Sequence, residues 1–444
     1  MITSRPPAHS AGLGQDVVNA LLTYGHKVNI LSLYGQKNQP DYMNSIYPYK
    51  KDIVGDIIES LKDIKLLRRF WVIIRKYLNL QFKTKSKYIR NNGISFVYPC
   101  ESKPHIPINK VLANITTEYD AVISLFWQDF ITSETLKAIY QRLRCPIIIY
   151  SVDMAPFTGG CYYFGDCRNF YSGCGRCPAL DSHELADDSN HNFAIKKANY
   201  SQMECYYLGN TWMNNFARKS NIFKADHIKL SSLVLNSRDF SPEIKETDKI
   251  RLPKGKDFGI LFRATHNLDI RKGELEFEKL MQSIFDNLSP QERSRIIILP
   301  VGKILDKDRK ARLKFDVMDI GSVSCDTLKN IYRISSVFVS LSLDDAGPSM
   351  VNQSMMCGTP VIAFNIGTAI DVINDGINGF KAPIKAIAPL AKGLLKLIRD
   401  RELLAEMSIR SREKALNVNS YEAFVNNITD ILRSSKTNRI SKPN

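Results

Sequence analysis

The residues that point most clearly to chemistry lie in segment 341–383, LSLDDAGPSMVNQSMMCGTPVIAFNIGTAIDVINDGINGFKAP. An apolar run, a tight acidic loop and a helix follow one another there, and Gly347 and Pro348 stand where the helix begins. The first N–H groups of a helix have no partner within it, so those of Ser349 and Met350 would face the loop mouth as an anion site. A diphosphate would fit there, although the same spacing also suits an ordinary turn between a strand and a helix.

The same segment resembles family 4 of the glycosyltransferases, retaining enzymes of the GT-B fold, and in particular its members from bacterial surface-polysaccharide pathways. The string CGTPVIAF followed by INDGINGFKAP is similar to the family's nucleotide-sugar signature. Such enzymes carry two acidic residues separated by seven others just upstream, and these positions fall on Asp345 and Gln353. The resemblance implies that Asp345 faces the donor sugar and that position 353 hydrogen-bonds the ribose. Gln353 departs from the usual Glu, so a charge-assisted hydrogen bond would be lost.

Two further stretches resemble the parts of this family that face the donor phosphates. The loop SAGLGQDVVNALLTYGHKVNIL is similar to its amino-terminal glycine loop, which implies phosphate contacts through Gly12 and Gly14. The stretch ILFRATHNLDIRKG is similar to the strand and loop that supply a cationic clamp, with Lys272 at the clamp lysine. Arg263 is the expected second cation, although the family more often has a small residue there. Two such cations would stabilise a leaving diphosphate; a solvated basic loop is the alternative.

Two departures from the family bear on catalysis. Relatives usually show His-Asp at a strand end where this chain has Val152 and Asp153, so Asp153 becomes the polar group expected at the reaction. A second family histidine is replaced by Phe126. These changes leave open an altered sugar preference, or an impaired homologue that only binds nucleotide sugars. Because Asp344 and Asp345 are adjacent rather than spaced as Asp-x-Asp, we expect catalysis without a divalent metal or another cofactor.

A cysteine-rich stretch, DMAPFTGGCYYFGDCRNFYSGCGRCPAL, resembles a block found in a subset of these polysaccharide enzymes. Four cysteines stand there within 17 residues: Cys161, Cys167, Cys174 and Cys177. Four thiols ending in C-x-x-C suit a tetrahedral structural zinc site, which would stabilise the loop. The first two spacings are not those of common zinc modules, so buried free thiols are the alternative.

The elements that must position these residues form two series of alternating strands and helices. The first begins with strands at 1–4 and 27–33 around a helix that Gly25 ends. Short apolar runs predict the other strands at 94–98, 121–125 and 147–150, then at 259–262, 296–301, 337–341 and 360–364. The alternation is typical of parallel, doubly wound sheets. We therefore expect an α/β protein of the GT-B fold, with two Rossmann-like domains facing each other across a cleft.

A length of 444 residues also favours two domains. We place the acceptor-binding domain at 1–240 and the nucleotide-sugar-binding domain at 241–444, because the polar stretch 236–253 carries two prolines. An earlier polar stretch, 182–220, ends the first series of elements. The last helices, about 384–434, are expected to finish the second domain and to cross back to the first.

The net charge of +16 is concentrated in one insert, residues 50–90, which has an excess of eight positive charges. Its apolar residues, Trp71 among them, recur every three or four positions as in an amphipathic helix, while Lys65, Arg69 and Lys76 lie off that stripe. The insert suits either packing on its own domain or contact with anionic lipid headgroups. Nucleic acid is disfavoured, because no helix-turn-helix, zinc-finger or aromatic RNA-binding signature accompanies the charge.

Composition and hydropathy indicate where the protein works. Apolar residues make up 44 % of the chain, no apolar run reaches the roughly 18 to 20 residues of a membrane helix, and the start MITSRPPAHS lacks signal-peptide features. We expect a cytoplasmic enzyme, peripheral on the inner face of the cytoplasmic membrane. The resemblance implies a hexosyltransferase that moves a sugar from a nucleotide diphosphate to a lipid-linked saccharide in O-antigen, capsule or exopolysaccharide assembly. A GT-B sugar-nucleotide epimerase is the remaining alternative.

Overall fold

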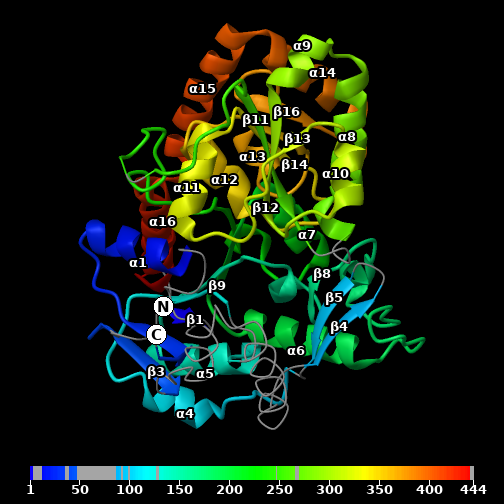
Figure 1. Cartoon of the computed structure of the whole chain (residues 1–444). Coiled ribbons are helices and arrows are strands. Elements are labelled where there is room, and N and C mark those ends of the chain that lie inside the picture. The colour runs from blue at the N-terminus through cyan, green and yellow to red at the C-terminus, as the bar shows by residue number, and fades with distance from the viewer. Residues whose placement is uncertain are drawn as a thin grey trace, which may run out of the picture.

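The protein folds into two lobes, each built on a parallel β-sheet (Figure 1). The structure is a computed structural model, and it describes residues 1–3, 13–35, 40–47, 87–91, 94–98, 101–126, 130–246, 248–265 and 270–440. The N-terminal domain forms the lower lobe in Figure 1 and the C-terminal domain the upper one. The expected α/β class with two parallel sheets is confirmed.

The N-terminal domain has a seven-stranded parallel sheet with the strand order β10-β9-β7-β6-β1-β2-β3. Its strands are β1 (Ile2–Thr3), β2 (Ile30–Tyr34), β3 (Met43–Tyr47), β6 (Val122–Ser124), β7 (Ile147–Tyr150), β9 (Cys205–Gly209) and β10 (Ile228–Leu230). Its helices are α1 (Leu13–Thr23), α4 (Ile108–Ala113), α5 (Ser133–Leu143), α6 (Asp188–Ser201) and α7 (Thr211–Ser220), with short 3-10 turns η2 (Ala155–Phe157), η3 (Asn169–Ser172) and η4 (Ala225–His227). All four residues of β7 are buried, which explains its continuous apolar run.

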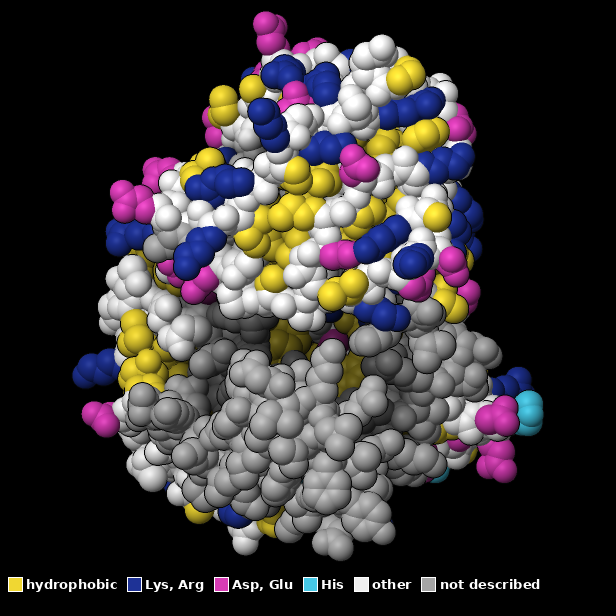
Figure 2. All heavy atoms as spheres, in the orientation of Figure 1, with side chains coloured by type: hydrophobic (Ala, Val, Ile, Leu, Met, Phe, Trp, Pro, Cys, Tyr) yellow, Lys and Arg dark blue, Asp and Glu magenta, His cyan; other side chains and the backbone are white. Residues whose placement is uncertain are grey.

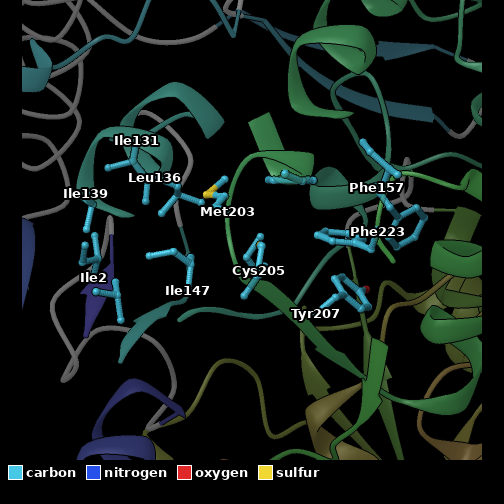
Figure 3. Close-up of a cluster of buried hydrophobic side chains, with 14 of the residues drawn as sticks. Ile2, Ile131, Leu136, Ile139, Ile147, Phe157, Met203, Cys205, Tyr207 and Phe223 are labelled. Atoms are coloured by element: carbon cyan, nitrogen blue, oxygen red, sulfur yellow. The ribbon is translucent and has the colours of Figure 1, made fainter. Parts of the chain in front are cut away.

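The core of this domain packs side chains of the sheet against helix α5 and against the turn η2 that follows β7 (Figure 3). Leu136 on α5 and Ile147 on β7 are fully buried at one end of the cluster. At the other end Phe157, the last residue of η2, packs edge-on against Tyr207 of β9, with ring centroids 5.9 Å apart. Burying each such side chain contributes about 1.5 to 3 kcal/mol, so these contacts hold the segment that follows β7 against the sheet.

A small antiparallel sheet corrects one sequence prediction. The segment predicted as a parallel strand at 94–98 is β5 (Ile94–Tyr98), but it pairs antiparallel with β4 (Lys87–Asn91) and β8 (Cys161–Tyr163). A short apolar run predicts a strand without saying which sheet it joins. The polar stretch 182–220 also does not end the first series, because it supplies α6, β9 and α7 to the same domain.

The C-terminal domain has a six-stranded parallel sheet with the order β13-β12-β11-β14-β15-β16. Its strands are β11 (Phe258–Ala264), β12 (Ile296–Gly302), β13 (Asp316–Val317), β14 (Val337–Ser340), β15 (Val361–Phe364) and β16 (Gly379–Ala382). Its helical elements are η5 (Ile270–Lys272), α8 (Glu274–Asp286), α9 (Pro290–Arg295), α10 (Lys307–Leu313), α11 (Cys325–Ile334), α12 (Ser349–Met356), α13 (Ala369–Val372), α14 (Ile387–Arg399), α15 (Arg401–Asn419) and α16 (Tyr421–Ile440). The four strands predicted here are all present, and helices cover the sheet on both sides (Figure 1).

The last helix, α16, returns to the N-terminal domain and lies beside α1 (Figure 1). Phe424 and Ile428 of α16 are buried in the same apolar cluster as Val17 of α1. Next to this cluster the hydroxyl of Tyr421 donates a hydrogen bond to Oδ1 of Asp16 at 2.8 Å. Helices α1 and α16, which lie far apart in the sequence, thus join the two domains through an apolar contact.

The basic insert lies outside the described residues, except for its last part, which belongs to β4. Its predicted helix, with Lys65, Arg69, Trp71 and Lys76, therefore stays a prediction. On the face shown in Figure 2, Lys and Arg side chains of the C-terminal domain are interspersed with Asp and Glu rather than gathered. Among the helices that the structure describes, none combines the length and the apolar character that a membrane crossing requires.

The buried carboxyl of Asp16 makes stability depend on pH. Burial raises the pKa of Asp16 to about 6, and the hydrogen bond from Tyr421 opposes this only in part. A carboxyl whose pKa is higher in the folded state stabilises the fold when protonated, and this contribution is lost as the pH rises through about 6. We predict that Asp16→Asn raises the free energy of unfolding at pH 7.5 by about 1 to 3 kcal/mol, and that the gain shrinks towards pH 4. Urea unfolding over this pH range measures it, and a gain independent of pH would exclude Asp16 as the cause.

Candidate active site

A cavity of about 340 Å³ lies between the two domains. From the N-terminal domain it is lined by Ser151 and Val152, which follow β7, and by Asn210, which follows β9. From the C-terminal domain it is lined by Arg263 near the end of β11 and by Asp345 in the loop after β14. The carboxyl ends of parallel strands are where α/β proteins bind ligands, and the volume suits a small molecule.

A buried ion pair forms part of the cavity wall. Nζ of Lys272 contacts Oδ2 of Asp345, and the two side chains expose only 11 % and 5 % of their surface. The other oxygen, Oδ1 of Asp345, accepts a hydrogen bond from the N–H of Gly347 at 3.1 Å. Burial acts to raise the pKa of Asp345, but the charge and hydrogen bond of Lys272, together with the N–H of Gly347 and the charge of Arg271, hold this pKa below its usual range. Asp345 is therefore ionised at neutral pH.

Gly273 lets Lys272 approach this loop. Its φ is +67°, and a Cβ at this position would overlap the carbonyl oxygen of Leu341 just after β14. Only glycine adopts this conformation without strain and with so close an approach. Helix α8 consequently begins directly against the loop that carries Asp345.

The N-terminus of α12 opens into the same cavity. Pro348 occupies its N-cap position and no side chain caps the helix, while Pro348 and Ser349 line the cavity. Met350 lines a small adjoining recess, and Arg263 and Lys272 line both spaces. An uncapped helix N-terminus in a cavity that two cations also line favours an anion, and a diphosphate in particular. The structure thus brings together the predicted donor-binding residues Arg263, Lys272, Gly347, Ser349 and Met350.

Gln353 lies one turn further along α12 and also lines the cavity, although only 4 % of it is exposed. Its Oε1 accepts a hydrogen bond from the hydroxyl of Tyr332 on α11 at 2.9 Å. Burial raises the pKa of Tyr332 well above its usual value, so this hydroxyl keeps its proton and donates. The Nε2 group of Gln353 is then the one available to a ligand hydroxyl. Two neighbours that the sequence did not single out, Asn352 and Thr368, line the same wall and are hydrogen-bonded to each other at 3.0 Å.

Asp153 does not lie where the sequence comparison suggested. Among the described residues that line the cavity, its neighbours Ser151 and Val152 are present and Asp153 is not. Its Oδ1 accepts a hydrogen bond from the N–H of Ala155 at 2.9 Å, and its side chain is buried. An Asp that bonds the backbone two residues on forms a turn, and Asp153 does so at the start of η2, while its role in the reaction stays a prediction.

The amino-terminal glycine loop is described only in part. Gly12 lies outside the described residues, and Gly14 is a buried residue in the first turn of α1. Leu13, rather than Gly14, lines the cavity. Phosphate contacts through these two glycines stay a prediction.

The four cysteines line one small cavity of about 20 Å³ next to β8. Sγ of Cys174 accepts a hydrogen bond from the N–H of Gly159 at 3.3 Å, and burial raises the pKa of Cys174 to about 12. Cys161, Cys167, Cys174 and Cys177 are free thiols. With side chains placed as they are, the described residues contain no group of three or more His, Cys, Asp or Glu that could hold a metal ion. The structural zinc stays a prediction, which the metal content of the purified protein would test.

Contacts between the domains involve the residues on either side of Asp345 in the chain, and sequence reasoning missed them. The N–H of Gly165 donates to Oδ2 of Asp344 at 3.0 Å, and the Nδ2 group of Asn210 donates to the carbonyl of Ala346. Burial raises the pKa of Asp344 to about 6, and its Oδ1 has no hydrogen-bond partner within the part of the chain that the structure describes. None of these residues belongs to a sequence motif that would have shown its partner in the other domain.

Solved structures of two-domain glycosyltransferases share this architecture along nearly the whole chain. Sucrose-phosphate synthase from Thermosynechococcus elongatus has a TM-score of 0.57 at 15 % identity, covering 95 % of this chain and 92 % of that one. A glycosyltransferase from Rickettsia africae has a TM-score of 0.58 at 14 % identity, covering 98 % of both chains. HepE of Anabaena in complex with UDP has a TM-score of 0.56 at 11 % identity, also covering 98 % of both. These likenesses show the fold, which is GT-B.

The family-model match lies in the C-terminal domain. Residues 275–414 match the family model of glycosyl transferases group 1, which indicates a glycosyltransferase domain. The match includes Asp345 and Gln353 but begins after Lys272. N-acetyl-alpha-D-glucosaminyl L-malate synthase of Bacillus anthracis is 25 % identical over 119 residues, which is 26 % of this chain. That match spans 31 % of the length of this curated relative.

The buried pair predicts how the fold responds to loss of Lys272. Lys272→Ala leaves the carboxylate of Asp345 buried without its counter-charge, which should lower the free energy of unfolding at pH 7.5 by about 3 to 5 kcal/mol. Adding Asp345→Asn should recover most of the loss, because the uncompensated charge is removed. Urea unfolding of the two single variants and the double variant measures this coupling.

An exposed pair in the same domain provides the control. Lys310 and Asp319 form an ion pair with 36 % and 25 % of their side-chain surface exposed. Lys310→Ala should cost at most about 1 kcal/mol, as surface pairs do. A loss no larger than this for Lys272→Ala would show that the pair near the cleft is solvated and adaptable.

Proposed function

We propose that the protein is a retaining glycosyltransferase of family 4 that uses a nucleotide-diphosphate sugar as donor. One observation carries the proposal: Arg263, Lys272 and the uncapped N-terminus of α12 face one cavity beside the ionised Asp345. Positive groups fixed in this way would bind the donor phosphates and stabilise the negative charge that grows on them as the sugar leaves. The UDP bound to HepE of Anabaena supports a donor of this class.

Transfer of the sugar can be described with the residues that line this cavity. The bond between the anomeric carbon and the diphosphate oxygen breaks, and its electron pair leaves with the diphosphate. Lys272 and Arg263, with the N–H groups of Ser349 and Met350, would stabilise that charge, while Asp345 would accept a hydrogen bond from a sugar hydroxyl once Lys272 turns to the phosphates. Retention requires the acceptor oxygen to bond on the face that the diphosphate leaves, so a phosphate oxygen can take the acceptor's proton. No divalent metal is required in this scheme.

We further propose that the acceptor is a lipid-linked saccharide in bacterial polysaccharide assembly and that the protein works at the inner face of the cytoplasmic membrane. This part of the proposal rests on the resemblance of residues 341–383 and on the charge of residues 50–90.

The transferase is tested by incubating the purified protein with radiolabelled nucleotide sugars and a bacterial membrane extract. Label that becomes extractable with lipid supports the proposal, and Asp345→Ala should abolish it. Binding of a nucleotide sugar without turnover would identify an impaired homologue. A rearranged nucleotide sugar would identify an epimerase, and either outcome would replace the proposal.

The ribose position makes a second prediction. In Gln353→Glu one carboxylate oxygen would keep the hydrogen bond from Tyr332 and the other would face the ribose hydroxyls. A hydrogen bond to a charged group is stronger by about 1 kcal/mol, so the donor should bind at least as tightly as to the original protein. Calorimetric titration measures this affinity, with the nucleotide sugar that the transfer assay identifies as the donor. Gln353→Met, which fills the same space without polar atoms, is the control and should bind more weakly; loss of folding in Gln353→Glu would place the side chain in the core.

Membrane contact is tested through the basic insert. Replacing Lys65, Arg69 and Lys76 together with Glu should release the protein from anionic vesicles, because each cation near such a surface contributes about 1 kcal/mol. Co-sedimentation with phosphatidylglycerol vesicles, with and without added salt, measures the effect, and salt should weaken binding of the original protein.

A matched triple variant in the C-terminal domain, with exposed Lys279, Lys307 and Lys392 replaced by Glu, should keep more of the binding. If the original protein fails to bind these vesicles even at low salt, the insert is a packing element and the membrane proposal fails.

A further inference from the structure

A side-chain contact joins the two domains directly beside the clamp lysine. Tyr163, at the end of β8 in the N-terminal domain, lines the interdomain cavity. The guanidinium carbon of Arg271, in η5 of the C-terminal domain, lies 3.7 Å from the centre of the Tyr163 ring. Arg271 immediately precedes Lys272, so this cation–π contact acts on the short segment that carries Lys272.

Arg271 is also bound to the loop that carries Asp345. Its Nη1 group donates a hydrogen bond to the carbonyl of Asp344 at 2.9 Å. Its own carbonyl accepts a hydrogen bond from the N–H of Leu343 at 2.6 Å. The backbone positions of Lys272 and Asp345 are therefore linked through Arg271, independently of the ion pair between their side chains.

A second contact crosses between the domains two residues after Tyr163. The N–H of Gly165 donates to Oδ2 of the buried Asp344 at 3.0 Å. Tyr163 thus contacts Arg271, and Gly165 contacts Asp344. Arg271 and Asp344 are themselves joined by the hydrogen bond described above. Separation of the domains at this edge must break both contacts at once and would leave Arg271 without the ring of Tyr163.

We propose that Tyr163 and Arg271 are positioning residues that hold Lys272 at the cleft when the two domains are closed. The flexible four-carbon stem of lysine does not by itself fix the ammonium group, so the place of Lys272 depends on the backbone that carries it as well as on its pair with Asp345. The ring of Tyr163 fixes that backbone through Arg271 only in the closed arrangement. Domain closure and placement of the phosphate-binding cation are thereby coupled. The role of Lys272 towards phosphate rests on the function proposed above, whereas the closure contact itself does not.

Two measurements test the coupling. The radius of gyration of the protein without ligand, from small-angle X-ray scattering, reports domain closure; calorimetric titration with uridine diphosphate reports the phosphate site. Tyr163→Ala and Arg271→Ala should each increase the radius of gyration and weaken uridine diphosphate binding about 2- to 30-fold, the range for a cation–π contact. Tyr163→Phe keeps the ring and should match the original protein in both measurements. The double variant Tyr163→Ala/Arg271→Ala should lose little more than either single variant.

Arg293→Ala is the matched control, because Arg293 lies 3.9 Å from the centre of the Phe285 ring within the C-terminal domain. It should change neither measurement. An unchanged radius of gyration in Tyr163→Ala and Arg271→Ala, or a Tyr163→Phe variant as impaired as Tyr163→Ala, would overturn the proposal. An increased radius with no binding of uridine diphosphate by any of the proteins, the original included, would support the closure contact and count against the proposed donor.

Discussion

The arrangement of the cleft depends on compensating two charges that the fold buries. Lys272 and Asp345 are both almost fully enclosed, and a charge removed from water destabilises a protein unless a partner and hydrogen bonds replace the water. The surrounding backbone provides this replacement. The N–H of Gly347 reaches the second carboxylate oxygen, and Gly273 lets helix α8 start close enough for Lys272 to reach the first. A preformed pair also means that a phosphate must compete with Asp345 for the lysine.

The two domains are joined in different ways on their two sides. At α16 the joint is apolar, with Phe424 and Ile428 buried in one cluster with α1. At the cleft the contacts among the described residues include single hydrogen bonds, such as those from Gly165 and Asn210, and the cation–π contact between Arg271 and Tyr163. Apolar burial is not directional and tolerates small shifts, whereas a hydrogen bond weakens steeply when its atoms move apart. A movement of the domains therefore weakens the contacts at the cleft edge, next to Lys272, more than the apolar contact at α16.

Local signals in the sequence predicted the helix that borders the C-terminal side of the cavity. The Gly-Pro pair before Ser349 and the Gly after Cys357 mark the helix that the structure places at 349–356. Prediction was wrong where one local sequence pattern is compatible with several arrangements of the chain. Residues 94–98 were predicted as a strand of a parallel sheet and are a strand, yet in the small antiparallel sheet. A run of apolar residues does not specify the strand with which it pairs, and a single acidic side chain does not specify its hydrogen-bond partner.

The sequence by itself determined the class of fold, four of the six strands of the second domain, and the helix N-terminus at Ser349. These follow from periodicity and from glycine and proline positions, which act over a few residues. Only the tertiary structure decided that Lys272 pairs with Asp345, that Gln353 is already bonded to Tyr332, and that Arg271 meets Tyr163 from the other domain. The physical reason is distance along the chain: such contacts form only after two sheets and the helices between them have packed, and no local rule of sequence encodes that packing.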